Sequence, residues 1–209
     1  MTEDFAPTLH PVEIARLRPT QMTVGLREVD RKRAEWRARA ERDGPDFLGR
    51  HMIPAIIGPK DVPYVIDHHH LVRALHEEGV SHVLVSVVAD LSHLKKSLFW
   101  TFLDNRNWLH PFDDEGARHS HEDLPKRVGA MKDDPYRSLA GEVRRSGGYA
   151  KDATPYSEFV WADFLRRKVR RKLLEEDFER AVVKGLDSAA SRDAAYLPGW
   201  CGRSDETSR

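Results

Sequence analysis

The sequence predicts an α+β protein, in which a small mixed sheet is followed by a helical C-terminal extension. Three observations lead to this expectation. Short apolar segments with strand-like patterns lie in the first half of the chain, no convincing strand pattern follows residue 121, and apolar residues in the second half recur at helical spacing. The 209 residues are enough for one domain with a sizeable extension.

The first elements are expected to be a strand, a turn and an exposed helix. Residues 12–17 alternate apolar and polar side chains, which predicts a half-buried strand that ends before residues 18–21 (Arg-Pro-Thr-Gln). Residues 26–40 are mainly helix-forming and charged, which predicts a mostly solvated helix. The sequence Asp-Gly-Pro-Asp at residues 43–46 is typical of a helix break.

A hairpin, a second helix and a buried strand are expected next. Residues 53–57 and 63–66 have the composition of short strands, and the turn-forming residues between them predict a hairpin. The spacing of apolar residues then predicts a helix over residues 68–78, with Asp67 as its N-cap. Residues 83–88 are nearly all apolar and β-branched, as expected of a central strand covered on both faces.

The rest of the chain is expected to be helical or irregular. Ser92 can cap a helix that ends at residues 104–107, and residues 109–121 form an irregular segment with three histidines. Pro135 is a favourable first residue for a short helix. An apolar stripe with a spacing of four residues predicts a longer helix that contains Trp161, Leu165, Val169 and Leu173.

The chain is expected to divide into three parts. Residues 1–110 would form a small α/β domain, residues 111–197 the helical extension and residues 198–209 a disordered tail. Cys201, in this tail, is the sole cysteine of the chain. It can form no intramolecular disulfide, and a metal site with several cysteines is excluded.

Charge and hydropathy restrict the partners. The 34 basic residues balance 34 acidic ones, so the composition does not favour nucleic acid as a partner. The basic run at residues 166–172 is followed at once by acidic residues, which indicates a solvated helix face rather than a phosphate-binding stripe. No stretch approaches about 18 consecutive apolar residues, and we expect a cytoplasmic protein without a membrane partner.

The residues with the clearest chemical potential are Asp67, His68, His69 and His70. They lie where a strand is expected to end and a helix to begin, and the N–H groups of a first helical turn favour an anion such as phosphate. Successive helical residues lie about 100° apart, so at most two of the three imidazoles can face one ligand. The other interpretation is that Asp67 only caps the helix and the histidines are ordinary polar residues. These histidines have no recognised metal-ligand spacing.

The order of these segments resembles the ParB/sulfiredoxin superfamily, especially its ParB-like nuclease branch. The resemblance runs from the early strand and residues 17–21 through the hairpin to residues 65–74 and covers about the first 110 residues. In that superfamily the second motif, for example Asp-Gly-His-His-Arg in free serine kinases, binds nucleotide phosphates at a helix start. Asp67, His69 and His70 match this form, whereas His68 replaces the glycine and Leu71 replaces the arginine.

The resemblance implies a nucleotide-binding enzyme that transfers phosphate to a small hydroxylated metabolite such as free serine. It implies catalytic roles for Asp67 and for Glu28, the latter as general base, with ATP, ADP or CTP and Mg²⁺ as cofactors. Arg73 is the candidate to replace the missing arginine. The residues expected to bind phosphate or nucleotide are Thr20, Gln21, Lys32, His68, His69, His70 and Arg73.

Three alternatives stay open. Glu28 and Lys32, four residues apart, could simply form a surface pair on a charged helix. The chain could be a ParB-like nuclease or a nucleic-acid-binding protein, although we find no helix-turn-helix pattern. It could also be a non-catalytic binding module with a vestigial nucleotide site, which the missing glycine and arginine of the second motif would explain.

Overall fold

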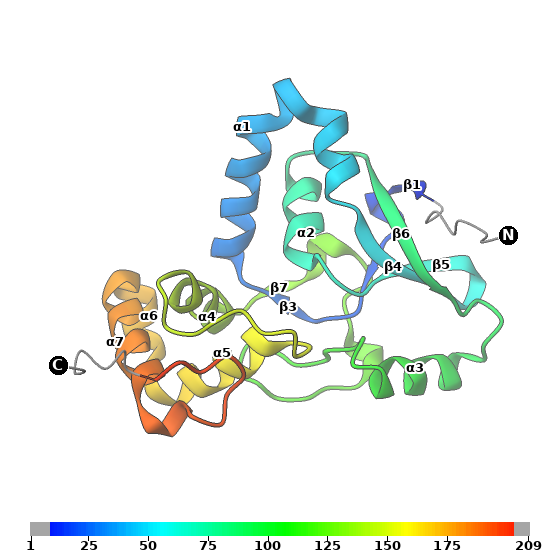
Figure 1. The fold of residues 1–209 in the computed structure, drawn as a ribbon. Coiled ribbons are helices and arrows are strands. Elements are labelled where there is room, and N and C mark those ends of the chain that lie inside the picture. Colours follow the sequence, from blue (N-terminus) through cyan, green and yellow to red (C-terminus); the bar gives the residue numbers. More distant parts are fainter. Residues whose placement is uncertain (1–8, 203–209) are drawn as a thin grey trace, which may run out of the picture. The chain divides into compact units, whose positions relative to one another are not determined.

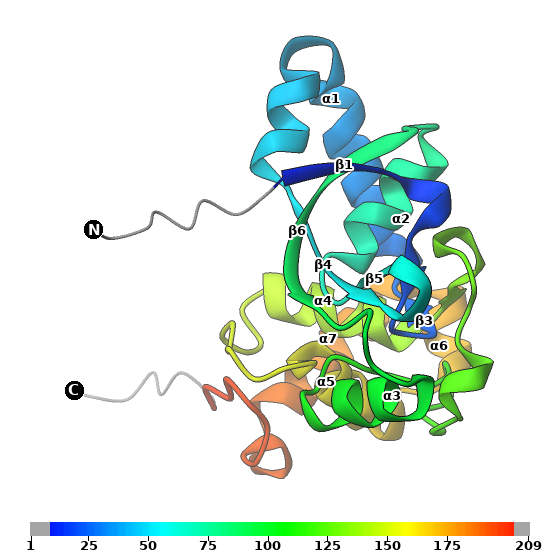
Figure 2. The ribbon, with the colours of Figure 1, turned by 90° about the vertical axis from the view of Figure 1, so that its right-hand side faces the viewer.

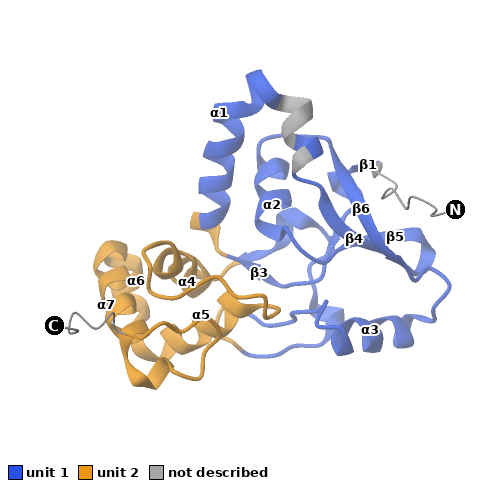
Figure 3. Ribbon diagram, in the orientation of Figure 1, with its two compact units in different colours: residues 1–24, 28–113, 117–132 blue, residues 25–27, 114–116, 133–209 orange. Residues whose placement is uncertain are grey.

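The computed structural model describes residues 9–202, apart from the side chains of residues 9, 10, 44–47 and 50. Two compact units are present (Figure 3). Unit 1 contains residues 1–24, 28–113 and 117–132, and unit 2 contains residues 25–27, 114–116 and 133–209. The expected division into domains at residues 1–110, 111–197 and 198–209 stays a prediction. Compactness alone does not show that a unit folds independently.

Unit 1 contains a curled mixed sheet. Within the described residues, its strand order is β1-β6-β4-β5-β2. β1 pairs with β6 and β4 with β5 in antiparallel fashion, whereas the β4–β6 and β2–β5 pairs are parallel. Figures 1 and 2 show the strands curving around helix α2. The bounds are β1 Leu9–Glu13, β2 Arg18–Pro19, β4 Ile53–Gly58, β5 Val62–Val65, β6 His82–Asp90 and α2 His69–Glu77.

The hairpin and helix α2 confirm the sequence expectations. β4 and β5 pair directly across a short turn, and α2 covers all but the ends of the predicted helix. Leu71, Val72 and Leu75 of α2 are buried, as their helical spacing predicts. The expected α+β class, with a helical C-terminal part, is confirmed.

Two expectations about unit 1 are wrong in detail, and a third, the break after the first helix, is met only in part. The strand at residues 12–17 ends at Glu13, because Ile14 turns away and donates its N–H to the Ser81 carbonyl, 2.9 Å away. Helix α1 (Leu26–Arg50) stays helical through the expected break at residues 43–46, although its axis turns back sharply between its two ends (Figures 1 and 2). β6 is not covered on both faces, since Val88 is half exposed at the irregularity opposite β4.

The remaining helix of unit 1 packs against the hairpin. α3 (Lys96–Asn105) begins four residues after the expected cap Ser92. Its Phe99, Trp100 and Leu103 are buried in a cluster with Ile56 of β4. Among the described residues, no helix of the chain is both long and apolar enough to cross a bilayer.

Unit 2 consists mainly of helices around one apolar cluster. Trp161, Leu165 and Val169 are buried as expected, but the predicted long helix is two helices, because α5 ends before Val169 and Leu173 belongs to α6. Unit 1 ends in a short strand, β7 (Lys132–Asp133, of which Lys132 is the last residue of unit 1), which pairs with β3 (Thr23–Val24) of the same unit, although no strand was expected after residue 121. The helices are α4 Pro135–Arg145, α5 Ser157–Lys168, α6 Arg171–Glu176 and α7 Phe178–Ala190.

Part of the C-terminal segment has a defined place in unit 2. The indole Nε1 of Trp200 donates to the Ala189 carbonyl, 2.9 Å away, and Trp200 forms a β-bridge with Tyr149. The Trp161 Nε1 donates to the Pro198 carbonyl, 2.8 Å away. The expected tail at residues 198–209 is therefore attached at its beginning, and residues 203–209 lie outside the described residues.

Candidate functional site

The structure brings the two sequence motifs together. β2 and β5 are in register, with Arg18 opposite Tyr64 and Pro19 opposite Val65. Thr20 follows β2 directly, and its Oγ1 donates to the Val65 carbonyl, 2.8 Å away. The Thr20 N–H points to Nε2 of His69 in the first turn of α2, at 3.3 Å. The first motif therefore lies against the start of the helix that carries the second.

His69 is the residue that links the motifs. Its side chain is buried, with 3% of the residue exposed, and its Nε2 accepts the hydrogen bond from the Thr20 N–H. Burial lowers the pKa of His69 to about 4, against the opposing effects of the Asp67 carboxylate and a backbone hydrogen bond with Val65. The imidazole is therefore neutral near pH 7, and the nitrogen that faces Thr20 is already occupied.

The N-cap of α2 is His68, and the expectation that Asp67 caps the helix is wrong by one residue. His68 has φ 62° and ψ 26°, and its side chain makes no capping hydrogen bond to α2. Asp67 Oδ1 accepts from the N–H of its neighbour His68 at 2.6 Å. Asp67 and His68 are exposed, and His70 is partly exposed. The start of α2 thus leaves polar side chains at the surface.

His68 occupies the backbone conformation that favours glycine, the residue found there in the serine kinase motif. We expect His68→Gly to raise the free energy of unfolding by up to about 1 kcal/mol, because a left-handed conformation strains a residue with a Cβ atom. His68→Val should lower it, because a β-branched side chain is worst accommodated there. Urea denaturation of both variants checks this. Equal stability of the valine variant and the original protein would contradict it.

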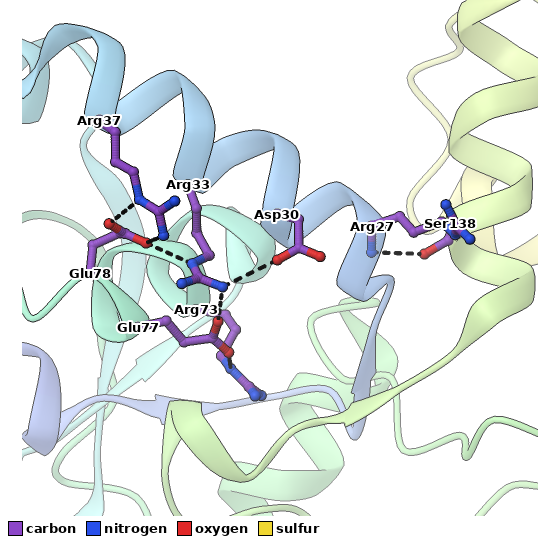
Figure 4. Close-up of polar contacts among 8 residues, drawn as sticks. All are labelled: Arg27, Asp30, Arg33, Arg37, Arg73, Glu77, Glu78 and Ser138. Atoms are coloured by element: carbon purple, nitrogen blue, oxygen red, sulfur yellow. Dashed lines mark hydrogen bonds and ion pairs between the residues drawn. The ribbon is translucent and has the colours of Figure 1, made fainter.

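Arg73 is engaged by neighbours in unit 1 (Figure 4). Its Nε lies 2.7 Å from Glu77 Oε1, and its Nη1 donates to the Met131 carbonyl at 2.7 Å. Glu77 in turn pairs with Arg33 of α1 at 3.1 Å. Binding of a phosphate by Arg73 would require exchange of these contacts, and its phosphate-binding role stays a prediction.

The same network holds α1 beside α2. Glu78, the C-cap of α2, accepts from Arg33 Nε at 2.7 Å and from Arg37 Nη2 at 2.6 Å. These two guanidinium groups lower the pKa of Glu78 to about 2. Because all three groups are close to solvent, the network fixes helix positions more than it adds stability.

Glu28 and Lys32 contact residues of their own helix. Glu28 lies in the first turn of α1, is 9% exposed and forms an ion pair with Arg31. Lys32 Nζ lies 3.6 Å from Glu35. The alternative interpretation expected a pair between Glu28 and Lys32. Instead, each of the two pairs with the residue three positions further along α1.

The segment of residues 109–121 lies beside the first motif, which the sequence did not indicate. The His110 N–H donates to the Thr20 carbonyl at 2.8 Å, and the Met22 N–H donates to the His110 carbonyl at 3.3 Å. Gln21, 3% exposed, donates its side-chain amide to the Thr23 carbonyl at 2.7 Å. The histidines of this segment are the sequence feature that could have indicated a functional role. Only the tertiary structure shows that the segment lies beside the first motif.

Within this segment His119 and Asp113 form a pair. Nε2 of His119 lies 2.7 Å from Asp113 Oδ2, and Oδ1 of the same carboxylate accepts from the Ala117 N–H at 2.8 Å. No group of three or more His, Cys, Asp or Glu side chains in the described part of the chain could hold a metal ion.

The basic run at residues 166–172 is largely neutralised within unit 2. Lys168 pairs with Asp193 at 2.6 Å and Lys172 with Glu176 at 3.7 Å. Arg171 pairs with Asp114 at 2.8 Å. The interpretation of this run as a charged helix face rather than a phosphate-binding stripe is supported by these pairs.

Comparisons with known proteins identify the family. The chain matches the model of a family described as "Putative ParB-like nuclease" over residues 10–167. It is also similar to a solved structure, protein Atu1540 from Agrobacterium tumefaciens, with 51% sequence identity and a TM-score of 0.88, over 94% of this chain and 100% of that one. No curated protein matches it. The family match covers well over half of the chain, and the chain therefore belongs to the ParB-like nuclease family.

Proposed function

We propose that this protein binds a nucleotide through its phosphate groups at the start of α2. The supporting observation is the contact of the Thr20 N–H with His69 Nε2, which holds the first motif against a helix start whose N-cap side chain makes no capping bond. The N–H groups of such a turn and the positive end of the helix dipole favour a phosphate. The exposed Asp67 and His68, together with His70, are the side chains at hand for the ligand.

The proposed reaction is transfer of the terminal phosphoryl group of ATP, ADP or CTP to a hydroxylated metabolite such as free serine. The acceptor oxygen forms a bond to phosphorus while the bond from phosphorus to the bridging oxygen breaks, and the acceptor proton passes to a base. Glu28 is the candidate base. Mg²⁺ bound to the phosphates of a nucleotide usually takes only one or two carboxylate ligands from the protein. Asp67 is the candidate ligand for this ion.

Asp67→Asn tests this proposal with little change in structure, because the amide oxygen of asparagine can still accept from the His68 N–H. We expect the variant to lose at least about tenfold in Mg²⁺-dependent nucleotide turnover with free serine, since the metal loses a charged ligand. His93→Ala, an exposed histidine on a loop, is the control and should keep full activity.

Turnover is measured with ATP, ADP and CTP, with and without serine, and nucleotide binding is measured by calorimetry. Serine-dependent turnover that falls in Asp67→Asn supports the proposal. Absence of nucleotide binding to the original protein refutes it. Binding without turnover refutes the transfer reaction and favours a non-catalytic binding module.

A second candidate function is hydrolysis of a phosphodiester, which family membership favours. In that reaction a water oxygen forms the bond to phosphorus and one ester oxygen leaves. The pair of His119 and Asp113 is suited to take up the proton of the water, because a carboxylate orients the imidazole. Incubation with plasmid DNA and with a single-stranded oligonucleotide, in the presence of Mg²⁺, distinguishes this function by strand cleavage.

A further inference from the structure

Unit 1 carries two adjoining hollows that share Arg18 and Lys126. The first is lined additionally by Arg16, Lys60 and Arg127, and by one acidic residue, Asp61. The second is lined additionally by Lys96 and by one acidic residue, Glu122. We call the two together the basic hollow. It gathers six cationic side chains and two carboxylates from separate parts of unit 1.

The cations of the basic hollow outnumber its carboxylates six to two. Arg16, Lys60, Lys96, Lys126 and Arg127 are exposed, and Arg18 is half-buried. Within the part of the chain that the structure describes, none of the six forms an ion pair with a carboxylate. In the basic run at residues 166–172, by contrast, Arg166, Lys168, Arg171 and Lys172 form ion pairs with acidic residues. A protein of zero net charge thus keeps a local positive surface, which attracts an anion with several charges.

Lys60 occupies a backbone position that would suit glycine. Lys60 and Asp61 both have positive φ, 64° and 55°, in the turn between β4 and β5. This conformation disfavours side chains with a Cβ atom and is usual for glycine in tight hairpin turns. Strained residues often serve binding, and the Lys60 side chain lines the hollow at this turn.

The second hollow adds aromatic rings to the charges. Tyr64, Trp100 and His121 line it, and the His121 ring stacks on Trp100 with centroids 4.9 Å apart. Tyr64 packs edge-on against Trp100 at 5.3 Å. Trp100 is 8% exposed and its buried Nε1 has no hydrogen-bond partner in the described structure. His121 is more exposed than Trp100, so of these two stacked rings the His121 ring is the better placed for a further stacking partner.

We infer that the basic hollow binds a single-stranded nucleic acid, with the cations on consecutive phosphates and a base stacked on His121. Cationic grooves lined with aromatic rings are the usual means of binding single strands, because every base has a face that can stack. A duplex keeps its bases inside and would use only the charges. This inference goes beyond the proposed nucleotide site, because its residues lie outside the second motif.

The test is fluorescence anisotropy of a labelled oligothymidine of about 12 nucleotides, titrated at several salt concentrations. The double variant Lys126→Ala/Arg127→Ala should weaken binding at least about tenfold and reduce the slope of log affinity against log salt by about 1.4, two phosphate contacts at about 0.7 each. Arg167→Ala/Arg170→Ala removes two exposed cations of unit 2 and should leave both quantities unchanged.

Two further variants separate binding from folding. Lys60→Gly should weaken oligonucleotide binding severalfold and yet unfold at the same or a higher temperature, because glycine relieves the strained turn. His121→Ala should weaken binding to the single strand about fivefold or more and leave binding to a duplex unchanged, since it removes stacking but no fixed charge.

The inference would be overturned if the Lys126→Ala/Arg127→Ala and Lys60→Gly variants bound the oligonucleotide as tightly as the original protein does. Tighter binding of a duplex than of the single strand would also overturn it. Asp67→Asn is included in the same titration and should bind the oligonucleotide normally. A failure of nucleotide turnover is thereby distinguished from a failure of strand binding.

Discussion

Arg166→Ala is expected to lower the free energy of unfolding by about 3–5 kcal/mol, because it leaves a buried carboxylate without its partner. Arg166 Nη2 lies 2.9 Å from Asp134 Oδ2, and the Asp134 side chain is only 2% exposed. Arg166 also pairs with Asp163 and donates its Nε to the Asp114 carbonyl at 3.1 Å. All these residues belong to unit 2. Chemical denaturation measures the effect.

Asp134 explains why the loss should be large. It caps helix α4 by accepting from the Tyr136 N–H at 2.9 Å, so its side chain cannot turn to solvent without loss of the cap. Burial already raises the pKa of Asp134, although Arg166 opposes this shift. Without Arg166 the pKa should rise further.

The pH dependence of this variant provides a second readout. A carboxyl group whose pKa is raised by folding destabilises the folded state at pH values above that pKa, and protonation removes the penalty. The deficit of Arg166→Ala should therefore be smaller at pH 4.5 than at pH 7.5. Arg167→Ala, an exposed neighbour, is the control and should change stability by less than about 0.5 kcal/mol. A deficit that does not depend on pH would contradict the role of Asp134.

The second large effect is expected on acidification, and it arises from His69. The pKa of this buried imidazole is about 4 in the folded protein against 6.5 for an ordinary histidine. Between these values the unfolded chain binds a proton that the folded protein does not bind, so stability falls as pH decreases from 6.5 to 4. The difference corresponds to about 3 kcal/mol over the whole range and about 2 kcal/mol at pH 5.

His69→Gln isolates this contribution, because glutamine can accept from the Thr20 N–H but does not titrate. The variant should lose about 2 kcal/mol less than the original protein between pH 7.5 and pH 5. His69→Leu should be less stable than either at pH 7.5, by about 1–3 kcal/mol, because it leaves the Thr20 N–H buried and unpaired. The same pH dependence in the glutamine variant would show that another group titrates.

Local patterns were sufficient where a signal and its consequence are close in sequence. The strand-forming residues on either side of a turn predicted the β4–β5 hairpin, and the spacing of Leu71, Val72 and Leu75 predicted α2. Both elements depend on interactions between residues that are close in sequence, so the sequence pattern alone is enough to predict them. The turn-forming residues 43–46 do not end α1, which is helical to Arg50, while the axis of the helix turns back between its ends (Figures 1 and 2).

The contact partners of the candidate site residues could not be predicted from local patterns. Thr20 and His69 are 49 residues apart in the chain, and their contact depends on the register of β2 and β5. His110 lies beside Thr20 for a similar reason, through a bridge between distant segments. The motif containing Asp67 could be found by its resemblance, but the burial of His69 and the N-cap position of His68 could not.

The sequence by itself determined the α+β class, the hairpin, the helix that carries the second motif and the resemblance to the ParB-like family. Only the tertiary structure decided which histidine is buried, that Arg73 and Glu28 contact nearby side chains, and that six cations without ion-pair partners, Arg18 among them, line the basic hollow. The physical reason is the range of the interactions. Backbone conformation and amphipathic spacing act within a few residues, whereas burial and charge pairing depend on segments that meet only after folding.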